Sequence, residues 1–288
     1  MALVLIIASV VLYNSLTPHE ITLRISTTTS LYATGLLEYL AEKFEEKHPD
    51  VIIQFIPVGS GEALRRAAKG DVDMVFVHAP LLEIKYINDS TLINGNIVAY
   101  NYFIIVGPHE DPAGIKGLDP IEAFKKIYKA GEEGLAVFVS RGDNSGTHVR
   151  ELYIWKLANL SPHGNEWYVE SGSGMSETLL IANELRAYTL SDIGTYLKLR
   201  TDGRIDLEPL VSKDDLLINI YSVYIVNPCK FGGVNYEVAK MFKDFVTSDE
   251  GQKLIGSYGV STYGQSLFLP AKDKYGELEM IWVELSKS

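Results

Sequence analysis

Residues 140–148 read Ser140-Arg141-Gly142-Asp143-Asn144-Ser145-Gly146-Thr147-His148. The apolar run at 135–139 just before this stretch has the pattern of a buried strand, and residues 149–160 just after it have the pattern of a helix. The stretch is therefore predicted to be a glycine-rich turn that leads from a strand into a helix N-terminus. Backbone N–H groups at a helix N-terminus have no partner within the helix, and the macrodipole adds partial positive charge there, so the turn is suited to bind a small anion.

The side chains of this turn add further donors. Arg141 contributes a full positive charge and a planar fork of N–H groups that fits oxyanions, and Ser145 and Thr147 contribute hydroxyl groups. Asp143 can form an ion pair with Arg141 that braces the turn, either in place of ligand binding or together with it. Arg141 is therefore the first candidate for a ligand-binding side chain.

Three more turns rich in hydroxyl groups or glycine each lie between a predicted strand and a predicted helix. They occupy residues 26–30 (STTTS), 58–61 (VGSG) and 171–176 (SGSGMS). One serine or threonine before a helix is an ordinary N-cap, but the run at 26–30 has more hydroxyl groups than a cap needs. Because such turns gather at the carboxyl ends of sheet strands, the four turns together predict one shared site.

The composition narrows the class of protein. The chain has 288 residues, enough for two domains, and 47% of them are hydrophobic, which is ample for globular cores. The net charge of −11 argues against nucleic acid and anionic membrane surfaces as partners, so an anion site must be built locally. Cys229 is the single cysteine of the chain, which excludes an internal disulfide.

The first residues are nearly all apolar. Residues 1–13 are too few to span a membrane and have the length of a signal-peptide core. No lysine or arginine precedes the run, and no cysteine near its end could carry a lipid anchor. We predict that residues 1–18 are an export signal or an uncleaved anchor. The protein is then secreted, periplasmic or tethered to the cell surface, with membrane contact only through this segment.

Strand and helix patterns alternate after the leader, which predicts an α/β fold with mostly parallel sheets. Two long strand-like runs, 97–106 and 218–226, each carry an asparagine and tyrosines. Runs of this kind can cross between two domains. We therefore expect a discontinuous first lobe (19–100 and 223–288), an inserted second lobe (101–222), and a ligand cleft between them.

Several segments resemble, in the same order, those of the tungstate-binding proteins of ABC importers, the TupA type. These segments are Thr27-Thr28-Thr29-Ser30, Gly59-Ser60-Gly61, Val77-His78-Ala79-Pro80, Tyr100-Asn101-Tyr102-Phe103, Ser140 to His148 and Gly172-Ser173-Gly174-Met175. The element at 140–148 is specific to the family, whereas the Gly-Ser-Gly elements are not. The resemblance implies a two-lobed periplasmic-binding-protein fold of the second type, with two mixed or parallel sheets flanked by helices and with hinge strands between the lobes.

The resemblance also implies a ligand and its contacts. The ligand is a tetrahedral oxyanion, tungstate before molybdate, and no cofactor is expected. Asn101 and Ser222 lie midway in the two long strand-like runs, so we expect a monomer to close over the ion by bending at these residues. Closure would then signal occupancy to a membrane permease that a separate ATPase drives. The implied ligand-binding residues are Thr28, Thr29, Ser30, Ser60, Arg141, Ser145, Gly146, Thr147, Gly174 and Met175, with Asp143 and His78 in support.

His78 marks a difference from similar phosphate-binding proteins, which have an aspartate just before the corresponding Ala-Pro. A carboxylate there accepts the proton of hydrogen phosphate, whereas a protonated His78 does not. This substitution favours an unprotonated dianion such as tungstate or molybdate. Two alternatives stay open: His78 is a packed cleft-wall residue hydrogen-bonded to the backbone, or the protein is a molybdate or phosphate receptor of the same fold.

An enzyme would need chemistry that the sequence does not supply. Ser145 and His148 lie close together at a predicted helix start, but no nucleophile elbow surrounds Ser145. The other histidines lack the spacing of metal ligands, and there is no P-loop. The sequence therefore predicts a binding protein without catalytic residues, metal or cofactor, and a periplasmic hydrolase is a remote alternative.

Overall fold

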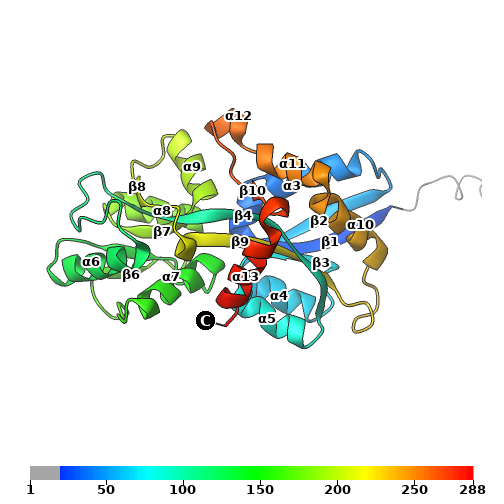
Figure 1. The fold of residues 1–288 in the computed structure, drawn as a ribbon, viewed down its shortest axis with the longest axis horizontal. Helices are drawn as coiled ribbons and strands as arrows, with labels where there is room; N and C mark the ends of the chain where they lie inside the picture. The colour runs from blue at the N-terminus through cyan, green and yellow to red at the C-terminus, as the bar shows by residue number, and fades with distance from the viewer. Residues whose placement is uncertain (1–19, 288) are drawn as a thin grey trace, which may run out of the picture.

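The structure, a computed structural model, describes residues 20–287 (Figure 1). The leader predicted at 1–18 lies outside the described residues. Within the described part of the chain, no helix is both long enough and apolar enough to cross a membrane.

One half of the molecule is built on a mixed sheet whose strand order is β10-β4-β9-β3-β1-β2. Its strands are β1 (Ile21–Thr28), β2 (Val51–Val58), β3 (Met74–Val77), β4 (Leu92–Gly107), β9 (Ile218–Val226) and β10 (Leu269–Pro270). The helices of this half are α2 (Thr29–Ala33), α3 (Leu36–Glu45), α4 (Ser60–Ala67), α5 (Pro80–Asn88), α10 (Tyr236–Thr247) and α11 (Asp249–Ser257).

The other half continues from the far end of β4. There β4 pairs with β7 (Thr189–Asp192) and β8 (Glu208–Val211), and a short parallel pair, β5 (Phe138–Ser140) and β6 (Tyr168–Glu170), joins β7 through a bridge between Phe138 and Tyr188. The helices of this half are α6 (Pro120–Glu132), α7 (Gly146–Leu157), α8 (Met175–Glu184) and α9 (Ile193–Thr201).

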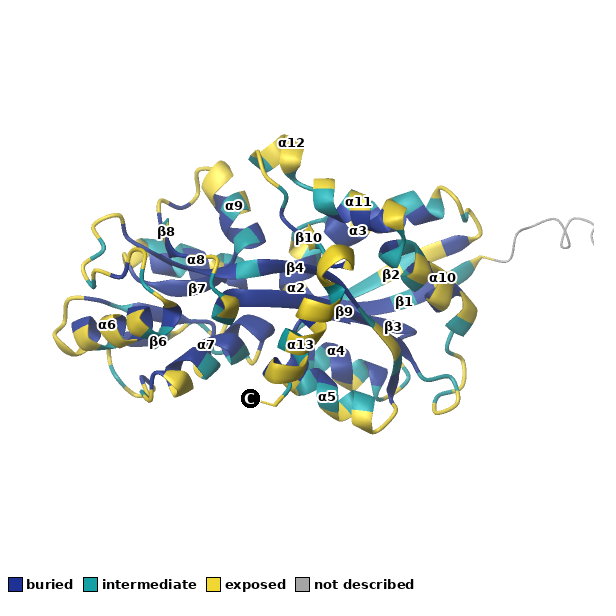
Figure 2. Cartoon of the chain, in the orientation of Figure 1, coloured by how far each residue is buried: buried dark blue, intermediate teal, exposed yellow. Residues whose placement is uncertain are grey.

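Each half has its own hydrophobic core, as the buried strands in Figure 2 show. In the first half, α3 turns Leu37, Leu40 and Phe44 toward the sheet at helical spacing, and all three are buried. In the second half, Phe124, Phe138 and Trp155 pack ring against ring. The two cores are separate, as expected for a chain of 288 residues, which is long enough for two domains.

The long strands β4 and β9 run side by side through the middle of the molecule (Figure 1). They are antiparallel, with Asn101 opposite Asn219, and β9 is also antiparallel to β3. The prediction of mostly parallel sheets is therefore wrong for this part. The physical reason is the crossing itself, because a strand that returns beside β4 must run in the opposite direction. The division into lobes at residues 100–101 and 222–223 stays a prediction.

Two predicted helices are broken in the structure. The run at 32–47 divides at Gly35, which adopts φ +81°, a conformation that other residues rarely adopt, and an added Cβ there would lie 2.6 Å from the Tyr258 hydroxyl oxygen. The run at 234–258 divides at Ser248, whose Oγ accepts from the Gly251 N–H (3.2 Å) and so starts a new helix, α11.

The C-terminal segment contains elements that the sequence did not indicate. They are α12 (Val260–Tyr263), the edge strand β10, a 3₁₀ turn at Lys272–Lys274 and α13 (Tyr275–Leu285); another 3₁₀ turn, Asp215–Leu217, precedes β9. Helix α13 lies against β4 and α5, across the middle of the molecule (Figure 1). Trp282 of this helix donates from Nε1 to the buried carboxylate of Glu83 on α5 (3.1 Å). The C-terminal helix is thus fixed to the first half.

Candidate functional site

The stretch at 140–148 forms the turn from β5 into α7, as predicted, although the helix starts three residues earlier than the pattern suggested. Ser145 is the N-cap, and its Oγ accepts from the backbone N–H of His148 (3.3 Å). Gly146 and Thr147 are the buried first residues of α7, so their N–H groups have no partner within the helix. The turn therefore presents free backbone donors in a buried place.

Arg141 is buried beside this helix start, with its side chain 3% exposed. Its Nη2 pairs with Asp143 Oδ2 at 2.5 Å, so the ion pair left open by the sequence is present. Its Nε is also buried, and it has no hydrogen-bond partner among the described residues. The ion pair thus holds the guanidinium in place while one of its donors stays unused.

Two buried hydroxyl groups also lack a hydrogen-bond partner among the described residues. Thr147 Oγ1 and Ser60 Oγ have no partner within residues 20–287, and Ser60 is the first residue of α4 in the other half. A buried polar group without a hydrogen bond costs about 1–3 kcal/mol. Unused donors at the N-termini of two helices are the pattern expected where an anion binds.

The hydroxyl-rich run at 26–30 lies at the end of β1 and the start of α2. Thr28 caps α2 by accepting from the Leu31 N–H (3.3 Å), and its Oγ1 lies 3.5 Å from Ser30 Oγ. Thr29 differs from its neighbours, because it is exposed. Thr27, which was not among the predicted ligands, is buried and has an Oγ1 without a partner among the described residues.

His78 stands between these hydroxyl groups and the crossing strands. Its Nδ1 lies 2.8 Å from Asn219 Oδ1, and its Nε2 lies 3.4 Å from Ser30 Oγ. Because Asn219 donates from Nδ2 to Asn101 Oδ1 (3.1 Å), its Oδ1 is the acceptor. This network assigns the His78 proton to Nδ1 and leaves Nε2 as an acceptor for Ser30.

Two predictions about His78 are corrected by this geometry. Burial lowers the pKa of His78 to about 4, and the charges of Arg141 and Arg150 act in the same direction. The ring is therefore neutral near pH 7 and accepts through Nε2, unlike the protonated ring considered from the sequence. Its Nδ1 also bonds to the side chain of Asn219 and not to the backbone, because the crossing strand β9 brings that asparagine next to it.

Direct contact between the halves occurs at Gly146. A Cβ added there would lie 2.8 Å from His78 Cε1 and 2.9 Å from the backbone oxygen of His78. Both distances are shorter than van der Waals contact, so only glycine allows the start of α7 to approach His78 this closely. The glycine in the turn is required by a residue distant in the sequence.

The fourth predicted turn lies beside Arg141. Ser171 Oγ donates to the Arg141 carbonyl oxygen (3.3 Å), and Gly174 is the N-cap of α8. The Met175 side chain is buried in the apolar cluster that includes Leu179, so its contribution to an anion site would be its backbone N–H. A carboxylate that the sequence did not indicate, Asp192 at the N-cap of α9, is also buried close to the charge of Arg141, and burial raises its pKa.

The groups that could suggest an enzyme have structural roles. Ser145 Oγ caps α7, and His148 Nδ1 accepts from the Asn144 N–H (3.0 Å), so the two do not form a nucleophile–base pair. Glu151 accepts from Ser140, Trp155 and Tyr168, and its pKa is raised to about 7 by burial. No cluster of ligands for a metal ion occurs among residues 20–287.

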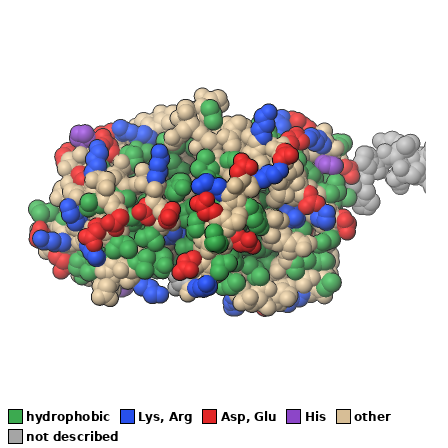
Figure 3. All heavy atoms as spheres, viewed as in Figure 1, with side chains coloured by type: hydrophobic (Ala, Val, Ile, Leu, Met, Phe, Trp, Pro, Cys, Tyr) green, Lys and Arg blue, Asp and Glu red, His purple; other side chains and the backbone are tan. Residues whose placement is uncertain are grey.

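The face of the molecule shown in Figure 3 gives no sign of long-range attraction of anions. Acidic and basic side chains are interspersed on the face shown in Figure 3. This distribution agrees with the expectation that, at a net charge of −11, any anion site depends on local donors.

Comparison with known proteins agrees with this fold. A model of the PBP superfamily domain matches residues 16–250. The tungstate-binding protein TupA of Peptoclostridium acidaminophilum is 39% identical to this chain, over 85% of the chain and 84% of its own length. The chain belongs to the TupA family of the PBP superfamily. Members of this family are solute-binding receptors of ABC transporters and not enzymes, so the predicted family, fold class and lack of catalysis are confirmed.

Two solved structures resemble the chain over most of its length. The tungstate ABC transporter protein from Geobacter sulfurreducens is 46% identical, with a TM-score of 0.74, and the match covers 82% of this chain and 98% of that one. The tungstate-binding protein TupA from Desulfovibrio alaskensis is 39% identical, with a TM-score of 0.75, and the match covers 86% of this chain and 98% of that one.

Proposed function

We propose that this protein binds one tungstate ion per chain and presents it to the permease of an ABC importer driven by a separate ATPase. The observation that carries the proposal is the set of buried, unused donors: Ser60 Oγ, Arg141 Nε and Thr147 Oγ1. The names of the TupA relatives support the choice of ion. Because an importer's permease takes up its solute from the outer side of the membrane, we propose that the protein is exported to that side. We propose that it acts there as a monomer.

The chemistry of the donors supports a fully ionised oxyanion. Hydroxyl groups, a guanidinium and helix N-termini all donate hydrogen bonds, and each oxygen of such an ion accepts them. Hydrogen phosphate would also need an acceptor for its proton. The Nε2 of His78 already faces Ser30, and the Asp143 carboxylate already accepts from Arg141 and from the Ser145 N–H (3.1 Å). Molybdate shares the charge and nearly the size of tungstate and is the second ligand that fits this set.

The donors belong to both halves of the molecule, which supports binding by closure. Ser60 and Ser30 come from the first half, whereas Arg141, Ser145, Gly146 and Thr147 come from the second. We propose that the lobes close by bending near Asn101 on β4 and Ser222 on β9, so that both sets of donors reach one ion only in the closed form. The exposed side chain of Thr29 is the weakest member of the ligand set implied by the sequence.

Isothermal titration of the same preparation with tungstate, molybdate, phosphate and sulfate tests the proposal. We expect one site per chain, tungstate bound at least as tightly as molybdate, and phosphate and sulfate far weaker. Phosphate as the tightest ligand would refute the assignment of the ion. No binding of any of the four would refute an oxyanion site.

A further inference from the structure

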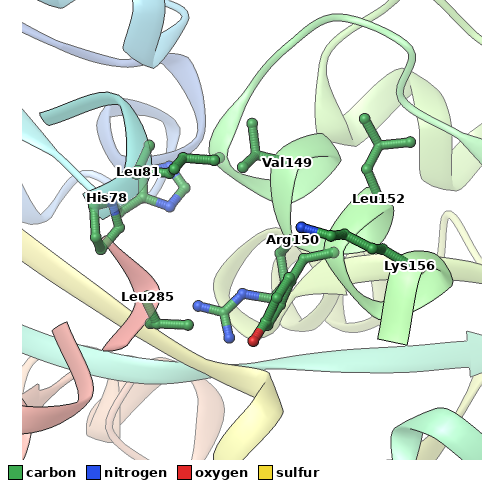
Figure 4. A pocket seen from close by; sticks show the side chains of 11 residues that line it. His78, Leu81, Val149, Arg150, Leu152, Lys156 and Leu285 are labelled. Carbon is green, nitrogen blue, oxygen red and sulfur yellow. The ribbon is translucent and has the colours of Figure 1, made fainter. Parts of the chain in front are cut away.

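A cavity of about 240 Å³ lies between the two halves, next to the contact between His78 and Gly146 (Figure 4). Most of its wall is apolar, including Pro80, Leu81 and Val149, but two basic residues of α7, the buried Arg150 and the exposed Lys156, also border it. We propose that Arg150 is a specificity-determining residue that supplies the net positive charge by which this site selects a dianion over a monoanion of the same shape. This inference rests on the proposed oxyanion site.

The position of Arg150 places its charge close to the proposed ion. It follows Gly146 by four residues on α7, so the two share a face of the helix at a rise of about 6 Å. Side chains on a helix lean toward its N-terminus, which carries the Arg150 side chain back toward the turn of donors. Arg150 and His78 border the same cavity, and the positive charge of Arg150 lowers the pKa of His78.

The charge of Arg150 has no negative partner among residues 20–287. The residue is 7% exposed, its Nη1 donates to the Leu216 carbonyl oxygen (2.5 Å), and its guanidinium lies 5.8 Å from the centre of the Phe103 ring. Its polar partner is that backbone carbonyl, and no carboxylate of the described residues is among the groups that shift its pKa. Burial lowers the pKa of Arg150 to about 10, so the side chain is still charged near pH 7. A buried charge without a counter-ion is costly, and a bound anion nearby would offset that cost.

Arg141 cannot supply this net charge, because it is already paired. The Asp143 carboxylate neutralises its guanidinium at 2.5 Å, and the buried Asp192 lies close to the same charge. The two arginines thus divide the work. Arg141 contributes directed N–H donors, but its positive charge is neutralised by Asp143. Arg150 contributes the positive charge that the proposed oxyanion site would otherwise lack.

A pair of ions with one shape and different charge tests this division directly. Perrhenate is a tetrahedral monoanion of nearly the size of tungstate, so titration with both ions separates charge from fit. The interaction with a fixed charge is proportional to the charge of the ligand. At a separation of about 10 Å and an effective dielectric constant of about 20, removing one charge weakens binding of a monoanion about 15-fold and of a dianion about 250-fold.

The variants are Arg150→Gln, Arg150→Lys and, as a matched loss of one charge, Arg65→Gln on the exposed face of α4. We expect Arg150→Gln to reduce the preference for tungstate over perrhenate about 15-fold. Arg150→Lys should keep most of that preference, and Arg65→Gln should leave both affinities close to wild type. Thermal unfolding without ligand shows that each variant is folded.

An equal decrease in affinity for tungstate and perrhenate in Arg150→Gln would overturn the inference. It would mean that Arg150 only holds the segment at Leu216 in place. Unchanged affinities would overturn it as well. If the wild-type protein bound neither ion, that result would contradict the proposed function. The titration with tungstate, molybdate, phosphate and sulfate tests that function independently.

Discussion

Replacement of Gly146 by alanine separates closure of the two halves from the stability of the fold. The new Cβ would meet His78 Cε1 at 2.8 Å and the His78 backbone oxygen at 2.9 Å, and a backbone atom cannot move aside cheaply. Within α7 itself the change is harmless, because alanine is the better helix former. Because Gly146 and His78 belong to different halves, the proposed opening of the lobes would relieve the clash, so its cost would fall on the closed, ligand-binding form.

The size of the effect follows from the degree of overlap. Overpacking of this kind costs typically 1–3 kcal/mol, and about 2 kcal/mol corresponds to a roughly 30-fold weaker affinity for tungstate. At a concentration 100 times the wild-type dissociation constant, tungstate stabilises the wild-type protein by about 2.7 kcal/mol. The same concentration would stabilise the Gly146→Ala variant by only about 0.9 kcal/mol.

The assay compares thermal unfolding and tungstate titration of Gly146→Ala with those of Gly61→Ala. Gly61 is a matched control, because it also lies in the first turn of a helix at the site, and its added Cβ would meet only the flexible end of Arg65 at 3.6 Å. We expect both variants to unfold like wild type without ligand, and only Gly146→Ala to lose ligand stabilisation. Wild-type affinity in Gly146→Ala would show that the bound form does not contain this contact, and the argument for closure through it would be wrong.

Three further predictions concern the ligand, the histidine and the motion. Arg141→Ala should weaken tungstate binding by roughly 2–5 kcal/mol, whereas Arg65→Ala should have little effect in the same titration; equal effects would place the site on another turn. The contribution of His78 to the free energy of unfolding, measured as the difference between wild type and His78→Gln, should fall by on the order of 3 kcal/mol as the pH drops from about 6.5 to about 4, because the unfolded chain protonates His78 more readily than the folded protein does. The raised pKa values of the buried Glu151 and Asp192 act in the opposite direction and are common to both proteins. Denaturant unfolding should show a smaller pH slope for His78→Gln, and an unchanged slope would contradict the buried neutral ring. Tungstate should reduce the radius of gyration and protect residues 28–30 and 145–147 from hydrogen exchange together; protection in one half alone would favour a site within a single lobe.

The local features of the site were predictable because local residues cause them. The strand, the donor-rich turn and the helix after it all follow from one short stretch of sequence, although the helix begins at Gly146 with Ser145 as its cap, three residues earlier than predicted. The hydroxyl-rich run at 26–30 was likewise predicted to lead into a helix, but the short helix α2 that Thr28 caps was not separated from α3. The elements that were missed depend on distant partners: α13 forms against α5 and β4, and the break at Gly35 accommodates Tyr258.

Sequence alone thus determined the kind of site, since donor-rich turns at strand–helix junctions attract an oxyanion wherever the fold places them. Only the tertiary structure decided the protonation of His78 and the ion pairing of Arg150, which lie near these turns. His78 is neutral because the surrounding fold excludes water, an effect that outweighs the hydrogen bond between its Nδ1 and Asn219 on β9, which by itself raises the pKa. Arg150 keeps an unpaired charge because no acidic side chain of the described chain packs within reach of it, although nothing in the neighbouring sequence distinguishes it from an ordinary surface arginine. Electrostatic surroundings are a sum over residues far apart in the chain, and the sequence becomes informative about them only after folding has brought those residues together.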